Sequence, residues 1–142
     1  EGIFVGYRYH DLNRTNLMFP FGFGLSYSTF EYSGLKIEKI SEKSIDISFN
    51  VKNTGLYDGA ETTQLYVSEM NAAITRPVKE LKGFTKVFIP KNESRTCRII
   101  LDTDQLKFFD PVQKKWLMNG GSYKLQIGSS SADIRLTDNI VI

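Results

Sequence analysis

The feature that most restricts the fold is a strict alternation of apolar and polar residues. Between Ile45 and Lys52, two isoleucines, a phenylalanine and a valine alternate with aspartate, serine, asparagine and lysine. A two-residue period puts every apolar side chain on one face of an extended strand, whereas a helix would spread them around its axis. The segment is therefore predicted to be a half-buried β-strand.

The same alternation recurs along the rest of the chain. In one segment Thr63, Leu65 and Val67 are expected to face inward, with Gln64 and Tyr66 on the opposite face. Further strands are predicted at 84–89, 97–101, 123–127 and 134–136, the last as an edge strand. From the centres of these rows we expect a core in which four side chains face one another: Phe49, Leu65, Ile99 and Leu125.

Turn residues separate the strands at regular spacing, at positions 53–55, 58–59 and 90–92. One short helical turn is expected at 102–106, where Asp102 can cap it, and no long helix is expected anywhere. About seven or eight short antiparallel strands with such turns are typical of a β-sandwich. The fold class is predicted to be all-β.

Length and composition agree with one domain. The chain has 142 residues, 41% hydrophobic and 24% charged, with a net charge of +2 and no basic stripe, so we expect no nucleic-acid partner. Apolar runs are too short for a membrane span. Cys97 is the single cysteine, which excludes an internal disulfide and leaves the compartment open. Because the chain begins at Glu1 without a leader, we expect it to be a piece of a longer polypeptide.

The segment 1–30 lacks a stable period and is predicted to be an extended arm. Within it, the run 19–30 holds four phenylalanines, a tyrosine, two glycines and a proline, without a charge. The glycines permit close backbone approach, and the rings need an apolar partner. The run either packs on the sandwich or forms a docking face for a neighbouring domain.

Several motifs, in order, resemble family 3 glycoside hydrolases, which are enzymes of the β-glucosidase and β-xylosidase type. The run 19–30 resembles F-P-F-G-x-G-L-S-Y-T-x-F, and 1–11 resembles E-G-I-x-V-G-Y-R-Y-Y-D with His10 in place of a tyrosine. Segments 61–67 and 76–84 are similar to E-V-V-Q-L-Y-V and R-P-x-K-E-L-K-G-F. Later matches fall at 108–110, 116, 121–123 and 128–131.

The resemblance implies the C-terminal fibronectin type III-like (immunoglobulin-like) domain of such an enzyme. It implies a docking arm at 1–32 and a sandwich at 33–142. Its partners would be the catalytic domains of the same polypeptide, with a second copy as a further option.

Catalytic residues are not expected in this chain. A retaining glycosidase needs two carboxylates about 5–5.5 Å apart, and the resemblance places both in other domains. Glu61, Glu80 and Asp110 belong to the sandwich motifs and are interpreted as structural. His10 is the single histidine and lies far from Cys97, so neither a metal site nor a cofactor is predicted. The fragment is predicted not to be an enzyme, although its parent is expected to be a glycosidase.

The candidate interdomain docking residues all lie in the arm: Tyr7, Arg8, Tyr9, Phe19, Phe21, Phe23 and Tyr27. The Arg8 guanidinium is expected between the rings of Tyr7 and Tyr9; the alternative is an extended, solvated linker.

Two further groups come from the sandwich motifs. Arg76, Pro77 and Glu80 form a candidate structural motif, a loop into a strand where Arg76 could pair with an acidic partner. The alternative is a rigid turn with solvated charges. Trp116 is interpreted as a core residue, with sugar stacking as the alternative.

The predicted function is that of a non-catalytic domain that packs on and stabilises the catalytic domains. The alternatives are a carbohydrate-binding or an oligomerisation module of the same enzyme. A binding module should carry a row of exposed aromatic side chains on one sheet face or loop.

Overall fold

The computed structural model describes residues 2–72 and 74–142. The helical elements are α1 (Tyr7–Asn13) and the 3₁₀ helix η1 (Thr103–Leu106). The strands in this part of the chain are β1 (Phe30–Ser41), β2 (Ser44–Asn53), β3 (Gly59–Glu69), β4 (Glu80–Ile89), β5 (Ser94–Asp102), β6 (Phe108–Asp110), β7 (Lys115–Leu117), β8 (Ser122–Gly128) and β9 (Ile134–Val141). The structure has more strands than the seven or eight predicted from alternation, because the short strands β6 and β7 were not expected.

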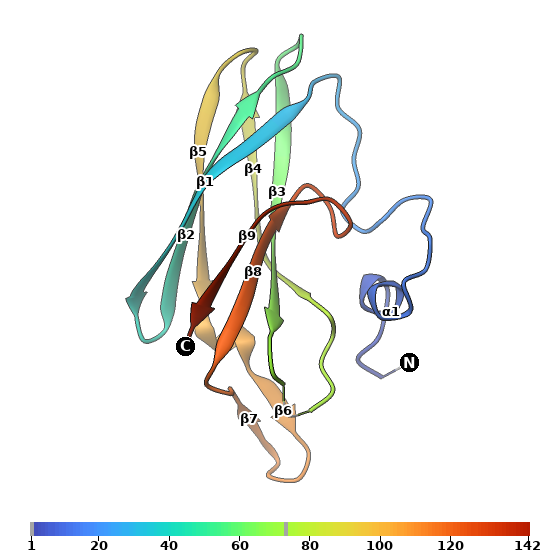
Figure 1. The fold of residues 1–142 in the computed structure, drawn as a ribbon, viewed down its shortest axis with the longest axis vertical. Coiled ribbons are helices and arrows are strands. Elements are labelled where there is room, and N and C mark those ends of the chain that lie inside the picture. The colour runs from blue at the N-terminus through green and yellow to red at the C-terminus, as the bar shows by residue number, and fades with distance from the viewer. Residues whose placement is uncertain (1, 73) are drawn as a thin grey trace.

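The strands form a sandwich of two antiparallel sheets, which confirms the predicted fold class (Figure 1). One sheet has the order β1-β2-β5 and the other has the order β4-β3-β8-β9, with β9 at an edge as predicted. A small third sheet, the β6–β7 hairpin, extends beyond one end of the sandwich. No helix in the described residues is long and apolar enough to cross a membrane.

The core lies between the two large sheets. Phe49, Leu65, Ile99 and Leu125 have exposed fractions of 1%, 0%, 6% and 0%, which confirms that the centres of the alternating rows are buried. On β2 the inward row is fully alternating, because each buried residue is followed by a more exposed one. The register prediction for the inner faces is therefore correct.

One buried polar side chain fastens the end of β2 to three other parts of the chain. The Asn53 amide nitrogen donates to the carbonyls of Tyr57 (2.8 Å) and Ile89 (2.9 Å). Its oxygen accepts from the Ser28 hydroxyl (2.6 Å) and the Gly55 N–H (3.0 Å). All hydrogen-bonding capacity of a buried amide is thereby used, which is the condition for burying it without a large penalty.

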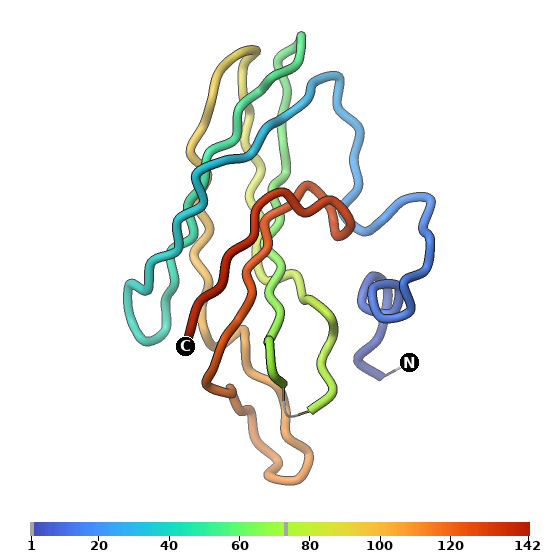
Figure 2. The backbone as a smooth tube through the Cα atoms, viewed as in Figure 1, coloured from blue at the N-terminus to red at the C-terminus, as the bar shows by residue number. Residues whose placement is uncertain are grey.

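Strand β3 departs from the predicted pattern. Gln64 and Tyr66, expected on the outer face, have exposed fractions of 4% and 0%, so five consecutive residues of β3 are buried. The cause is visible in Figure 2, where the N-terminal arm runs along this side of the sandwich before the chain crosses into β1. The arm covers the outer face of β3, which the strand pattern alone did not reveal.

The arm also contains a helix that the sequence did not predict. Helix α1 has no side-chain cap at Gly6, and the chain leaves it through Arg14 in the left-handed region (φ 49°). Because a helix of this length is marginal by itself, tertiary contacts must hold it. The other helical prediction is confirmed, since the Asp102 carboxylate caps η1 by accepting from the Asp104 N–H (2.8 Å). The division at residue 32 remains a prediction.

Candidate functional site

Helix α1 is fastened to the beginning of β4 by three side chains on one of its faces. The Tyr7 hydroxyl accepts from the Leu81 N–H (2.7 Å), Arg8 pairs with Glu80 (3.0 Å), and Asp11 pairs with Lys79 (2.7 Å). Positions 7 and 8 lie four and three residues before position 11, about one helical turn away, so all three side chains can reach the same neighbouring segment. The arm is therefore anchored to the sandwich at three successive residues, 79–81.

The predicted stacking of Arg8 between two rings is wrong. A helix turns successive side chains in different directions, so Tyr7 and Tyr9 do not flank the guanidinium. The Tyr7 ring stacks on Phe21 (centroids 5.0 Å apart, interplanar angle 27°) and meets Tyr66 edge-on (5.9 Å, 75°). The alternative of an extended linker is also wrong, because the segment is helical and held by these contacts.

Arg76 joins the same region in a largely buried ion network. Its guanidinium contacts the carboxylates of Glu69 (3.3 Å) and Glu80 (2.9 Å), and Lys82 approaches Glu80 at 3.5 Å. Burial alone would raise the pKa of the Glu80 carboxyl, but the Arg76 hydrogen bond and the charges of Lys82, Arg76 and Arg8 hold it below its usual value. The acidic partnership predicted for Arg76 is confirmed, and the alternative of solvated charges does not fit this burial.

The aromatic run is attached to the sandwich through its backbone. The Ser131 N–H donates to the Phe21 carbonyl (2.8 Å), and the Gln64 amide nitrogen donates to the carbonyls of Gly22 (3.2 Å) and Ser129 (2.7 Å). Gly22 has a φ of +78°, and a Cβ there would lie 2.3 Å from the Gln64 amide oxygen. A glycine is required at 22, whereas Gly24 has open space around it.

Four of the five rings in the run are exposed, whereas the ring of Phe30 packs against the core. The exposed fractions of Phe19, Phe21, Phe23 and Tyr27 are 66%, 47%, 45% and 93%. Phe19 and Phe23 contact each other at 5.4 Å between centroids, and Tyr27 meets Tyr57 edge-on. The run is thus fixed by its main chain while most of its aromatic surface stays uncovered in this chain.

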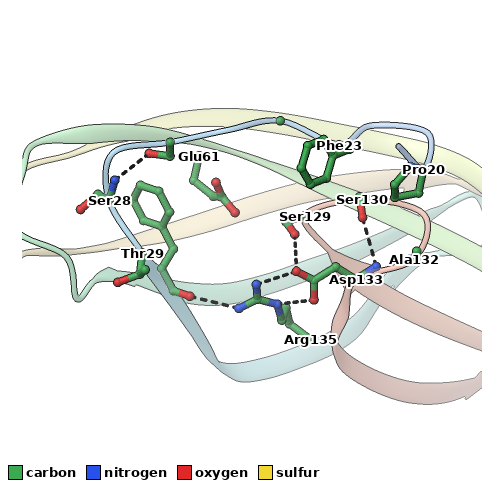
Figure 3. A pocket seen from close by; sticks show the side chains of 13 residues that line it. Pro20, Phe23, Ser28, Thr29, Glu61, Ser129, Ser130, Ala132, Asp133 and Arg135 are labelled. Atoms are coloured by element: carbon green, nitrogen blue, oxygen red, sulfur yellow. Dashed lines mark hydrogen bonds and ion pairs between the residues drawn. The ribbon is translucent and has the colours of Figure 1, made fainter. Parts of the chain in front are cut away.

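Beside the run lies an open pocket of about 490 Å³, drawn in Figure 3. Asp133 and Arg135 from β9 and its loop form a bidentate ion pair at its floor, and Arg135 also donates to the Phe30 carbonyl (3.2 Å). Glu61 of β3 accepts from the Tyr32 hydroxyl (2.7 Å). Asp133 and Arg135 were not predicted from the sequence to be site residues. The available signal was their spacing of two residues, which puts both side chains on one side of an extended segment.

The carboxylates of this pocket are already bound. Asp133 accepts from Arg135 and from the Ser129 hydroxyl (2.9 Å), and the Arg135 hydrogen bond lowers its pKa. Burial raises the pKa of Glu61, and the hydrogen bond from Tyr32 partly offsets that rise. In this arrangement Asp133 is a poor nucleophile because a guanidinium engages both of its oxygens.

In the described ranges 2–72 and 74–142, no three His, Cys, Asp or Glu side chains gather into a group that could hold a metal ion. The single histidine, His10, contacts the Thr15 hydroxyl at 2.7 Å. Cys97 is buried in the core, and burial raises the pKa of its thiol, which makes it a weaker nucleophile.

Trp116 is not a core residue, contrary to the prediction. It has an exposed fraction of 65% on β7 and lies opposite Phe109 of β6, which is 50% exposed. The two rings meet edge-to-face with centroids 5.8 Å apart. The three-residue strands of this hairpin lie outside the two packed sheets, so the usual tendency of tryptophan to be buried does not apply.

Comparisons with known proteins agree on one type of domain. Residues 61–131 match the fibronectin type III-like domain family. Over 99% of its length the chain is 43% identical to thermostable β-glucosidase B of Acetivibrio thermocellus, and over its full length it is 41% identical to an exo-α-(1→6)-L-arabinopyranosidase of Bifidobacterium breve. In both cases it covers 19% of the relative, so the chain spans about a fifth of the length of these curated relatives.

Solved structures give the same result. The chain superimposes over its full length on a Bifidobacterium adolescentis GH3 β-glucosidase with a TM-score of 0.95 and 39% identity, covering 21% of that chain. It superimposes over 99% of its length on the Kluyveromyces marxianus β-glucosidase in complex with glucose, with a TM-score of 0.94 and 40% identity, covering 17% of that chain.

Proposed function

Because this chain belongs to the fibronectin type III-like domains of family 3 glycoside hydrolases, we propose that it is a non-catalytic, C-terminal domain of a β-glucosidase-type enzyme. Its role is to pack on the catalytic domains of the same polypeptide and stabilise them. The parent enzyme hydrolyses terminal β-linked sugars, and this domain supplies a rigid apolar surface rather than reacting groups.

One observation carries the proposal: apolar side chains gather around the arm on the outer side of the β4-β3-β8-β9 sheet. Leu25, Phe84 and Phe88 are 91%, 68% and 60% exposed, and they add to the exposed rings of the run 19–30. Large exposed apolar patches on a soluble domain mark interaction sites. Gln64 and Ser131 fix the backbone of the arm. The rings of the run are therefore already positioned, and the entropy cost of ordering them when a partner packs on them is small.

The engaged state of the carboxylates supports a non-catalytic role. Asp133 is occupied by Arg135, Glu80 by Arg8 and Arg76, and Glu61 by Tyr32. A retaining glycosidase needs one free carboxylate as nucleophile and one protonated partner. We expect the purified 142-residue chain not to hydrolyse aryl β-glucosides; turnover that disappears on Glu61→Gln or Asp133→Asn would overturn this.

The packing role is tested by comparing matched variants in two contexts. In the full-length parent, Phe84→Asp combined with Phe88→Asp should lower the melting temperature, because two charges would be placed in an apolar contact. In the isolated 142-residue chain the same change should have little effect, because both rings are exposed. The control is Ile40→Asp with Ile100→Asp, at 56% and 49% exposed positions of the other sheet.

Two outcomes would contradict the proposal. Equally small changes of melting temperature for the two variant pairs in the full-length parent would show that neither surface is covered there. If the isolated chain dimerises and the Phe84/Phe88 variant is monomeric while full-length stability is unchanged, the surface serves a second copy, which is the oligomerisation alternative.

A further inference from the structure

A second aromatic surface lies at the β6–β7 hairpin, beyond one end of the two large sheets. Trp116 and Phe109 pair across the hairpin with rings inclined at 68°. They border a pocket of about 420 Å³, within the range of about 300–1,000 Å³ that is usual for small-molecule sites. The pocket lies between the hairpin and residues of the arm and of the loop before β4.

The pocket is amphipathic. Its apolar side is formed by Phe108, Phe109 and Trp116, and its polar side carries Arg8, Glu80 and Lys107. Phe108 is only partly exposed and has the Arg76 guanidinium 5.3 Å above its ring centroid. Aromatic faces on one side and fixed hydrogen-bonding groups on the other suit a ligand that has both apolar and hydroxylated faces.

The charges around the pocket are already paired. Arg8 contacts Glu80 (3.0 Å), Arg76 contacts Glu80 and Glu69, and Lys107 contacts Asp104 (2.6 Å). An anionic ligand would have to compete with these carboxylates for each cation. A neutral ligand with hydroxyl groups can instead accept from the remaining guanidinium and ammonium N–H groups and donate to carboxylate lone pairs, without breaking the ion pairs.

We propose that this hairpin pocket is a saccharide-binding site, in which the C–H face of a pyranose ring stacks on Trp116. The partially positive C–H groups of a sugar complement the negative face of an indole ring, and the ring hydroxyls reach Arg8 and Lys107. The choice of a neutral β-linked glucan as ligand rests on the proposed function of the parent. The role of the domain would then include holding substrate chains in addition to packing.

The inclination of the two rings favours a chain over a single sugar. Trp116 and Phe109 do not form one flat platform, because their planes are 68° apart. Each ring can therefore contact a different residue of an oligosaccharide. We expect cellohexaose to bind more tightly than glucose.

The chain provides its own reporter, because Trp116 is its only tryptophan. Titration of the purified chain with cellohexaose should shift the tryptophan emission to shorter wavelength and saturate. Calorimetry should show binding at least about tenfold weaker for Trp116→Ala and for Phe109→Ala, since a lost aromatic contact is worth about 1.4 kcal/mol or more. Tyr57→Ala, at a 61% exposed ring in the loop before β3, is the matched control and should bind like the wild type.

Circular dichroism of each variant checks that the sandwich is intact, as expected for substitutions of exposed side chains. The proposal is overturned if cellohexaose and laminarihexaose leave the emission unchanged, or if Trp116→Ala binds as well as wild type. It is also overturned if a comparison of acrylamide quenching between the full-length parent and its Trp116→Phe variant shows Trp116 to be inaccessible, because the hairpin would then be a domain contact. The titration uses the isolated chain, whereas the packing role is tested by the Phe84 and Phe88 variants in the full-length parent. A negative titration would therefore refute the saccharide site without refuting the packing role.

Discussion

The outer faces of the two large sheets differ although their strands are built alike. On the outer face of the three-stranded sheet, Arg98 pairs with Asp46 (2.7 Å) and Thr96 donates to Asn50 (2.9 Å), and the Arg98 side chain is 60% exposed. On the four-stranded sheet, the arm covers the corresponding positions of β3. Strands with a similar alternation of apolar and polar residues therefore give one outer face that is exposed to solvent and one that is covered by the arm.

The difference shows what burial of polar groups requires. On the covered face, the Tyr66 hydroxyl donates to the Gln64 amide oxygen (2.5 Å), and the Gln64 amide nitrogen donates to two backbone carbonyls. On the solvated face, water can satisfy any group left unpaired. Hence a substitution on the covered face removes contacts and leaves orphaned partners, whereas one on the solvated face removes little.

The largest effect is expected in the core that both sheets share. Phe49→Ala should lower the free energy of unfolding by about 3–5 kcal/mol, because it removes a buried ring and leaves a cavity. Ile100→Ala, on the outer face of β5 and 49% exposed, is the control and should cost much less. Urea denaturation followed by circular dichroism measures both, and similar midpoints for the two variants would refute the register.

Truncating a buried side chain on the covered face should also lower the free energy of unfolding, by somewhat less than in the core between the sheets. Tyr66→Ala should cost about 2–4 kcal/mol, since the ring is fully buried and contacts Tyr7 edge-on. Tyr57→Ala, at a 61% exposed tyrosine, should have a small effect in the same denaturation experiment. If the two tyrosine variants are equally stable, the arm does not cover β3 in solution and the contrast between the two faces is lost.

The close contact between the aromatic run and Gln64 requires a glycine at position 22. Gly22→Ala should cost about 1–3 kcal/mol, from the strain of a positive φ and the clash with Gln64. Gly24→Ala, with open space, should be nearly neutral. In a double-mutant cycle, Gln64→Ala should relieve the clash but not the strain; fully additive unfolding energies would show that Gly22 and Gln64 are not in contact.

The smallest expected effect is a difference in pH dependence between two carboxyls. The folded pKa of Glu80 is lowered, so its contribution is complete above the unfolded pKa of about 4.3 and is lost as the pH falls through the folded value. The folded pKa of Glu61 is raised, so its contribution is greatest at low pH and declines as the pH rises from about 4.3 through the folded value.

Stability curves of Glu80→Gln and Glu61→Gln from pH 3 to 7 measure this difference. Glu80→Gln should flatten the acid loss of stability, and Glu61→Gln should make the rise with pH steeper. The same change of slope in both variants would contradict the opposite directions of the two pKa shifts.

The strand rows were predictable because a two-residue period is a local property of the sequence. Ile45 to Val51 alternate with polar residues, and their burial follows directly. Helix α1 could not be predicted in this way, because its first residue follows an uncapped Gly6 and its stabilising partners Lys79, Glu80 and Leu81 lie far along the chain.

The candidate site was predicted in part. The motif around Arg76 and Glu80 indicated an ion pair, and the glycines of the aromatic run indicated close approach, which the structure shows at Gly22. The exposure of Trp116 was missed because burial statistics for tryptophan describe packed sheets, not a hairpin beyond them. The docking role of the rings in the run stays a prediction, because it concerns a surface that this chain leaves uncovered.

The backbone contact between the run and the loop before β9 has a consequence for the order of folding. The Phe21 carbonyl accepts a hydrogen bond from the N–H of Ser131, and the Phe30 carbonyl accepts one from Arg135, so both bonds need residues more than 100 positions later in the chain. A ribosome makes the aromatic segment before these partners, so the backbone of the run stays unattached while most of the sandwich is synthesised. Contacts of such long sequence separation form slowly, and exposed apolar segments promote aggregation in the meantime. Expression yield should therefore depend on the aromatic run more strongly than the stability of the finished domain does.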